Sequence, residues 1–208
     1  MPSQPPSSLR HCNGNLLCCI DVETTGADPM IHEIIQVAFL PLNSNYTPMK
    51  ITPFYLNIRP MDIGTIDFRS VKVHKQTVVE MMAYAIQPEI AADMFMDWFY
   101  KLDLPLGKKL MPLWSGGSFD KGFLVQWLGN ELYNDCIHYH ERDTQSLALA
   151  INDRFDLNAE SPPFGRIGLA SLADYFGIIN ESAHDALADC ATTAKVYRAM
   201  LAMFQPNL

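Results

Sequence analysis

The sequence LLCCIDVETTG occupies residues 16–26 and joins a strand, two acids and a turn. The apolar residues 16–20 predict a strand buried inside a sheet. Asp21 and Glu23 follow two residues apart, so in an extended chain both carboxylates lie on one face of the sheet. Thr24-Thr25-Gly26 then predicts a tight turn. This stretch predicts a pair of acids at the carboxyl edge of a sheet, where α/β proteins bind ligands. The alternative is a solvated strand end with two ordinary acids.

The remaining hydrophobic patterns predict strands and helices along the whole chain. Further strands are expected at residues 33–40, 51–59 and 110–114, with a short one at 137–140. Helices are expected at 77–102 with a break at Gln87-Pro88, and at 119–128, 144–151, 169–176 and 186–203. Strands that come first, with helices interleaved later, are typical of a mixed α/β domain.

A third acid, Asp120, stands early in the predicted helix 119–128, after a strand and the Gly116-Gly117 turn. Phe119 and Phe123 lie on apolar faces of this helix and would direct Asp120 toward the sheet. An acid in the first turn of a helix also complements the helix dipole by itself, which is the alternative interpretation.

The segment His184-Asp185-Ala186-Leu187-Ala188-Asp189 contributes a histidine and a fourth acid. His184 and Asp189 are five residues apart, so they would not share a face if both were helical. We therefore expect His184 in the preceding loop, Asp185 as the helix N-cap and Asp189 in the first turns. The alternatives are a surface loop histidine and a charge on the helix surface.

In type, order and spacing, these three motifs resemble those of the DnaQ-like (DEDDh) 3'→5' exonucleases of the ribonuclease H-like superfamily. The resemblance runs from about Leu16 to Leu201. It implies a ribonuclease H-like mixed β-sheet flanked by helices on both faces. The common form of the second motif has Asn four residues before the acid, whereas this chain has Gly116. The run 114–120 is closer to a variant seen among exoribonuclease-like members, and this departure concerns substrate contacts more than the metal site.

The resemblance also implies a role for each member of the set. Asp21 would bridge two divalent cations, Mg²⁺ or Mn²⁺, with Glu23 and Asp189 completing one ion and Asp120 supporting the other. Oxygen ligands without sulfur favour these ions over zinc. His184 would act as the general base, since imidazoles titrate near neutral pH. The implied activity is hydrolysis of phosphodiester bonds at the 3' ends of single-stranded DNA or RNA, releasing nucleoside 5'-monophosphates.

Five residues are candidates for contacts with the substrate. Val22, Thr24 and Thr25 are expected beside the sugar and phosphate of the terminal nucleotide, and Phe119 is expected to pack against a base. His74 resembles a residue that borders the nucleotide pocket in relatives.

Other polar residues are given structural interpretations. Asp143-Thr144 begins a predicted helix and resembles a feature of the family, for which we expect a capping role rather than a catalytic one. His138 and His140 alternate along a predicted strand, and no third ligand of suitable spacing accompanies them.

The bulk properties limit the classes of protein. The 208 residues fit one domain, 16–208, preceded by a Pro- and Ser-rich flexible tail at 1–15. The five cysteines include no CxxC pair, and neither a signal peptide nor a membrane span is recognisable, so we expect a cytoplasmic protein without a membrane partner. The net charge of −8 disfavours long duplex contacts and indicates a short footprint or delivery by a partner.

Two other functions were weighed against exonuclease activity. A non-catalytic nucleic-acid-binding or polymerase-associated module with the same fold would be expected to have lost at least one of the five residues, and all five are present. A metallohydrolase acting on free nucleotides would cleave model phosphodiesters but not oligomers. The choice between DNA and RNA, the oligomeric state and any polymerase partner stay open at this stage.

Overall fold

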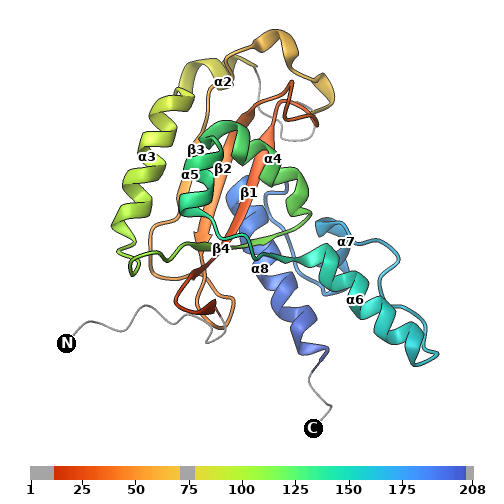
Figure 1. Ribbon diagram of the computed structural model, residues 1–208. Helices are drawn as coiled ribbons and strands as arrows, with labels where there is room; N and C mark the ends of the chain where they lie inside the picture. The colour runs from red at the N-terminus through yellow and green to blue at the C-terminus, as the bar shows by residue number, and fades with distance from the viewer. Residues whose placement is uncertain (1–11, 71–77, 205–208) are drawn as a thin grey trace.

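A mixed five-stranded sheet forms the centre of the structure, a computed structural model that describes residues 12–70 and 78–204 (Figure 1). Its strands are β1 (Leu16–Thr24), β2 (Ile34–Pro41), β3 (Phe54–Asn57), β4 (Leu110–Trp114) and β5 (Arg142–Asp143). They are arranged in the order β3-β2-β1-β4-β5. β2 pairs antiparallel with β1 and β3, whereas β4 pairs parallel with β1 and β5. The predicted mixed α/β sheet is confirmed.

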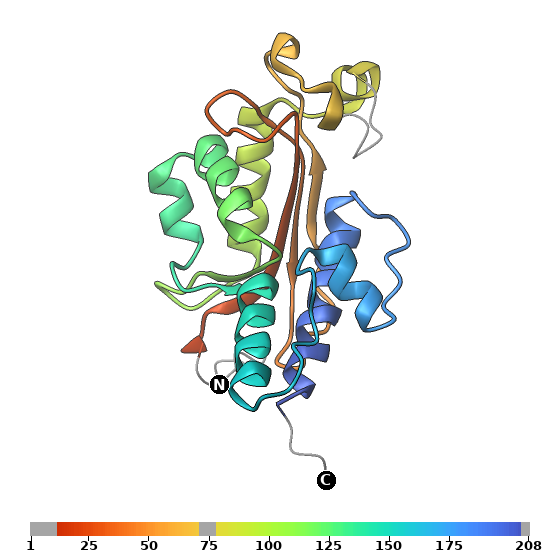
Figure 2. The ribbon, with the colours of Figure 1, turned by 90° about the vertical axis from the view of Figure 1, so that its right-hand side faces the viewer.

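Helices cover both faces of this sheet, as predicted. The helices of the described residues include the 3-10 helix η2 (Ile63–Thr65) and the α-helices α2 (Val78–Tyr84), α3 (Pro88–Lys101), α4 (Gly117–Leu128), α5 (Asn130–Cys136), α6 (Thr144–Leu157), α7 (Leu169–Tyr175) and α8 (Ala186–Ala202). Seen along the edge of the sheet, α3, α4 and α5 lie on one side and α8 lies on the other (Figure 2). The helices α6 and α7 pack beside α8 around a smaller apolar cluster of their own.

The alternation of side chains along β1 separates the two faces. The residues Leu16, Cys18, Ile20 and Val22 belong to the core shared with α3 and α4. The residues Leu17 and Cys19 belong to the core shared with α8. On α8 this second core begins with the small residues Ala186, Cys190 and Ala194, which let the start of the helix come close to the sheet, and continues to Tyr197. Because the period of a strand is two, Asp21 and Glu23 lie on the α8 face.

Aromatic rings fill much of the opposite face. Phe39 of β2 packs against Phe95 of α3 with ring centroids 4.7 Å apart, and Phe54 of β3 meets the same ring at 5.5 Å. Fully burying a side chain of this size contributes about 1.5–3 kcal/mol. The larger core therefore lies under the helices α3 and α4, on the side of β1 opposite to its acids.

The structure differs from the local predictions at three places. The strand predicted at 51–59 is confined to Phe54–Asn57. Residues 137–140 form no strand: Ile137 makes one isolated bridge to Leu110, and β5 begins later. The helix Asn130–Cys136 was not predicted, because its seven residues are too few to show a clear period and follow Gly129 directly.

The beginning of the chain also differs from the prediction. Residues 1–11 of the predicted tail lie outside the described residues. Residues 12–15 pack against the domain: Cys12 is buried, and the Asn15 side chain accepts a hydrogen bond from the Lys109 N–H at 2.8 Å. All five cysteines are buried free thiols. Within the part of the chain that the structure describes, no helix has both the length and the apolar character to cross a membrane.

Candidate active site

The acids of β1 lie on a stretch of the strand that pairs with β2 but not with β4. Pairing between β1 and β4 ends at Cys19 and Leu113, while β1 continues to Thr24 with β2 as its partner. Asp21 and Glu23 therefore stand beside a gap in the sheet, on the face that α8 covers. The predicted same-face pair is confirmed, although both acids lie inside the strand rather than after its end.

The chain leaving β4 fills this gap with a third acid. Gly116 adopts a left-handed backbone with φ of 93°, and α4 begins at the next residue. This turn places Asp120 over β1, where its Oδ1 accepts a hydrogen bond from the Val22 N–H at 3.1 Å. Asp120 is only 5% exposed. As predicted, it faces the sheet, and it satisfies a strand N–H that β4 no longer reaches.

The fourth acid and the histidine come from the start of α8. Asp189 is 8% exposed and accepts hydrogen bonds from the Asn180 side-chain amide and from the His184 N–H. His184 precedes the helix, is exposed and has a left-handed φ of 68°. Asp185 caps the helix by accepting from the Ala188 N–H, as predicted. The Asn180 contact was not predicted, since nothing in the local spacing marks an amide nine residues before an acid.

A polar network fixes the start of α8 to the sheet. The buried Gln36 of β2 accepts a hydrogen bond from the Ala186 N–H at 2.7 Å and donates to the Tyr55 hydroxyl at 3.0 Å. That hydroxyl in turn donates to Asp185 Oδ2 at 2.5 Å. Because His184 directly precedes these anchored residues, the network restricts where its backbone sits. These contacts join residues up to 150 positions apart, which is why the sequence did not reveal them.

Burial raises the pKa values of all four carboxylates, and repulsion by other members of the set adds to the shift for Asp21 and Glu23. Burial, followed by the charges of Asp120, Asp189 and Glu23, holds the pKa of Asp21 well above its ordinary value. Burial and the neighbouring acids raise the pKa of Glu23 to about 8. Burial raises the pKa of Asp120 to about 7, although the hydrogen bond from Val22 opposes this shift. The pKa of Asp189 is also raised, chiefly by burial. The site concentrates negative charge that protons or cations must neutralise.

The donor set fits hard divalent cations. One ligand atom from each of Glu23, His184 and Asp189 lies within 4.8 Å of the other two. Asp21 and Asp120 line the same cavity as Glu23 and Asp189. Carboxylate oxygens without thiolates are the ligands preferred by Mg²⁺ and Mn²⁺.

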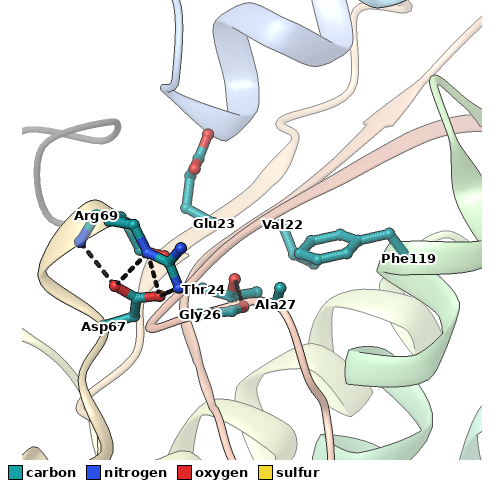
Figure 3. A pocket seen from close by; sticks show the side chains of 9 residues that line it. Val22, Glu23, Thr24, Gly26, Ala27, Asp67, Arg69 and Phe119 are labelled. Carbon is teal, nitrogen blue, oxygen red and sulfur yellow. Dashed lines mark hydrogen bonds and ion pairs between the residues drawn. The ribbon is translucent and has the colours of Figure 1, made fainter.

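Two adjoining cavities open at this site. One, of about 460 Å³, lies between Phe119 and Val22 on one side and the Asp67–Arg69 ion pair on the other (Figure 3). In the same view Glu23 extends from β1 toward the ribbon of α8. The other cavity, of about 420 Å³, contains the carboxylates and is also lined by Gly116 and Gln145. Arg69 and Gln145 were not predicted, because neither belongs to a recognisable motif.

Three of the predicted substrate-contact residues line these cavities. Val22 and Phe119 border both, and Phe119 is 40% exposed. Thr24 borders the first cavity, and its hydroxyl donates to the Gly26 carbonyl. The backbone of Gly26 lies close against the His32 ring, since a Cβ at this position would be 2.2 Å from the ring.

The structure does not place the other two predicted contact residues, Thr25 and His74, in the same way: Thr25 lines neither cavity, and His74 is not described. Thr25 is fully buried, and its hydroxyl accepts a hydrogen bond from the Glu33 N–H at 2.9 Å. Its backbone N–H and carbonyl are bonded to Glu33 and Asp67. Thr25 therefore holds the turn together, and its side chain is not among those that line the two cavities. His74 lies outside the described residues.

Comparisons with known proteins identify relatives of this fold. The exonuclease family model RNase_T matches residues 18–197. A structure of Exonuclease I aligns with a TM-score of 0.71 at 19% identity, covering 92% of this chain and 42% of that one. A structure of E. coli Exonuclease I in complex with a dT13 oligonucleotide aligns with a TM-score of 0.69 at 18% identity, covering 89% of this chain and 40% of that one. Cell-death related nuclease 4 aligns with a TM-score of 0.68 at 18% identity, covering 93% of this chain and 66% of that one.

The chain belongs to the exonuclease family, of the DnaQ-like DEDD type, because the family model covers most of its length. This confirms the predicted family and its ribonuclease H-like fold. The chain spans about two fifths of the length of the Exonuclease I structures that it matches. A sequence comparison with curated proteins finds no match.

Proposed function

We propose that this exonuclease-family chain is a metal-dependent 3'→5' exonuclease that releases nucleoside 5'-monophosphates from single-stranded ends. The observation that carries the proposal is the gathering of Asp21, Glu23, Asp120, Asp189 and His184 at one gap in the sheet, from β1, α4 and the start of α8. A non-catalytic module would have no need to keep four acids with raised pKa values around one cavity.

Each residue has a proposed role. Asp21 would hold both cations, with Glu23 and Asp189 on one and Asp120 on the other. Bound there, the cations would supply Lewis acidity to the attacking water and to the leaving 3'-oxygen. His184 would take the proton from the attacking water, for which its exposed position at the mouth of the site is suited. The Gln36–Tyr55 network would keep His184 in place.

The first cavity is the proposed place of the terminal nucleoside. Phe119 offers a partly exposed ring for a base, and Val22 and Thr24 form the floor beside the acids. Single-stranded DNA is one candidate substrate, because E. coli Exonuclease I has been crystallised with dT13 and dA16 oligonucleotides. RNA is the other, since the residues on which this proposal rests include no identified contact to a 2'-hydroxyl.

The test uses matched 5'-labelled DNA and RNA oligomers, single- and double-stranded, with Mg²⁺ or Mn²⁺ and with chelator. We expect a ladder that shortens from the 3' end in the presence of metal and is blocked by a 3'-phosphate. Asp21→Asn serves as the control for contaminating nuclease. Cleavage of a closed circle, or early release of a labelled 5' mononucleotide, would contradict the assignment. Turnover of model phosphodiesters without turnover of oligomers would indicate a nucleotide hydrolase instead.

A further inference from the structure

Gln145 lines the cavity that contains the carboxylates, although no motif pointed to it. It is the second residue of α6, and its side-chain amide lies directly over Gly116. A Cβ at position 116 would stand 2.8 Å from Gln145 Nε2, closer than real Cβ contacts allow. The glycine at 116 therefore leaves the space that the Gln145 amide occupies.

The backbone of Gln145 is held by hydrogen bonds, whereas its side chain has no hydrogen-bond partner among the described residues. Its N–H donates to Asp143 Oδ1 at 2.7 Å, and Asp143 Oδ2 accepts from the N–H groups of Gly116 and Gly117. Among the described residues, no hydrogen bond engages the Gln145 carboxamide, which is half-buried. A carboxamide offers two donors and one acceptor, so this group presents unused hydrogen-bonding capacity to the cavity.

The position of Gln145 relative to the two cavities indicates which part of a bound strand it would contact. Val22, Glu23 and Phe119 border both cavities, whereas Asp67 and Arg69 border the first, and Gly116 and Gln145 the second. A strand whose last nucleoside occupies the first cavity places its terminal phosphodiester at the carboxylates. The nucleotide beyond that bond then lies on the side of Gln145.

We propose that Gln145 is a substrate-binding residue that holds the second nucleotide from the 3' end, by a hydrogen bond from its carboxamide to the sugar–phosphate backbone. This inference rests on the proposed exonuclease function. Gln145 acts on the leaving-group side of the scissile bond, and it supplies from α6 an amide at the place where Gly116 has no side chain.

The test compares two substrates that differ beyond the scissile bond. One is an oligothymidylate, and the other is the p-nitrophenyl ester of thymidine 5'-monophosphate, which keeps the terminal nucleotide but has no second one. Gln145→Ala and the similarly sized Gln145→Met should lower the ratio of kcat/KM on the oligomer to kcat/KM on the ester by about tenfold or more, the effect of losing one hydrogen bond to a charged group. The inhibition constant of thymidine 5'-monophosphate should stay within about twofold.

The outcomes separate this inference from the function on which it depends. If the intact protein cleaves neither substrate and Asp21→Asn behaves identically, the exonuclease proposal fails. If the intact protein is active but Gln145→Met keeps the normal ratio, packing over Gly116 rather than hydrogen bonding is the role of Gln145, and the inference is overturned. Equal losses on the oligomer and in binding of the monophosphate would overturn it as well. Ser146→Ala, at the exposed neighbouring position of α6, should leave the ratio unchanged.

Discussion

Asp143 and Asp21 belong to strands that flank β4, and their carboxylates have opposite surroundings. Asp143 accepts four backbone hydrogen bonds, from Gly116, Gly117, Gln145 and Ser146, at 2.7–3.0 Å. In the described residues no hydrogen bond reaches the carboxylate of Asp21, and burial, followed by the charges of three other acids, raises its pKa. An acid whose oxygens are satisfied by the backbone stabilises the fold. An acid such as Asp21, without such donors and repelled by neighbouring acids, is suited to binding cations.

The largest expected effect comes from removing the charge of Asp21, whose carboxylate accepts no hydrogen bond from the described residues. Asp21→Asn should lower turnover by about 10³-fold or more, because it removes the ligand proposed to hold both cations. The same change should raise the melting temperature of the metal-free protein, since a neutral amide relieves the repulsion. Initial rates on a labelled oligomer and thermal melts in chelator measure the two effects.

Glu23→Gln, Asp120→Asn and Asp189→Asn should each show the same loss of turnover. Asp93→Asn, at an exposed position of α3, is the matched control. It should change neither the turnover nor the melting temperature. A near-normal rate in any of the site variants would remove that acid from the proposed set.

His184 tests whether the cluster of carboxylates includes a general base as well as metal ligands. His184→Ala should slow hydrolysis near neutral pH by about a hundredfold, the lower range for loss of a general base, and recover partly as the pH rises. Titration of Mn²⁺ by calorimetry should give an affinity close to that of the intact protein. His140→Ala, an exposed histidine on the chain leading to β5, is the control.

The position of His184 beside Glu23 and Asp189 makes the opposite outcome informative. If Mn²⁺ affinity disappears in His184→Ala, the imidazole is a metal ligand and the DEDDh assignment of the base is wrong.

Asp143, whose carboxylate accepts four hydrogen bonds, should show the opposite effect to Asp21: its loss should lower the stability of the fold. Asp143→Ala leaves four N–H groups without their acceptor and removes the cap of α6, so unfolding should become easier by about 2–3 kcal/mol. The melting temperature should fall by roughly 4–10 °C for a chain of this size. Asp153→Ala, at an exposed position of the same helix, should have little effect. A fall as large in Asp21→Asn would break the contrast between the two regions.

The smallest expected effect concerns pH. In the unfolded chain these acids titrate near pH 4, whereas in the folded chain the pKa is about 7 for Asp120 and about 8 for Glu23. The folded state thus retains protons that the unfolded state has released, so the stabilising contribution is full below about pH 4 and is lost as the pH rises toward 8. Melting temperatures in chelator should fall by several degrees between pH 5 and 8.

Saturating Mg²⁺ should flatten this pH profile, because bound cations replace the protons. A metal-free profile that rises over the same range would contradict the raised pKa values.

The sequence alone determined the features that depend on short distances along the chain. The spacing of two residues predicted that Asp21 and Glu23 lie on one face of β1. The pattern of the segment 184–189 predicted that Asp185 caps α8 and that Asp189 lies inside it. The cap formed by Asp143 was equally local. Strand alternation, helix periodicity and capping act over a few residues, so a pattern of residues is enough to predict them.

Only the tertiary structure decided which residues meet across the chain. Asp120 reaches the Val22 N–H from 98 positions away, because β4 ends before β1 does and α4 begins in the gap. The Gln36 anchor of α8 and the Gln145 amide over Gly116 likewise join separate elements. Thr25 shows the reverse: its place in the motif predicted a substrate contact, but the fold buried it. Such contacts depend on where strands stop and how closely helices approach the sheet, which packing of the whole domain sets and local patterns do not encode.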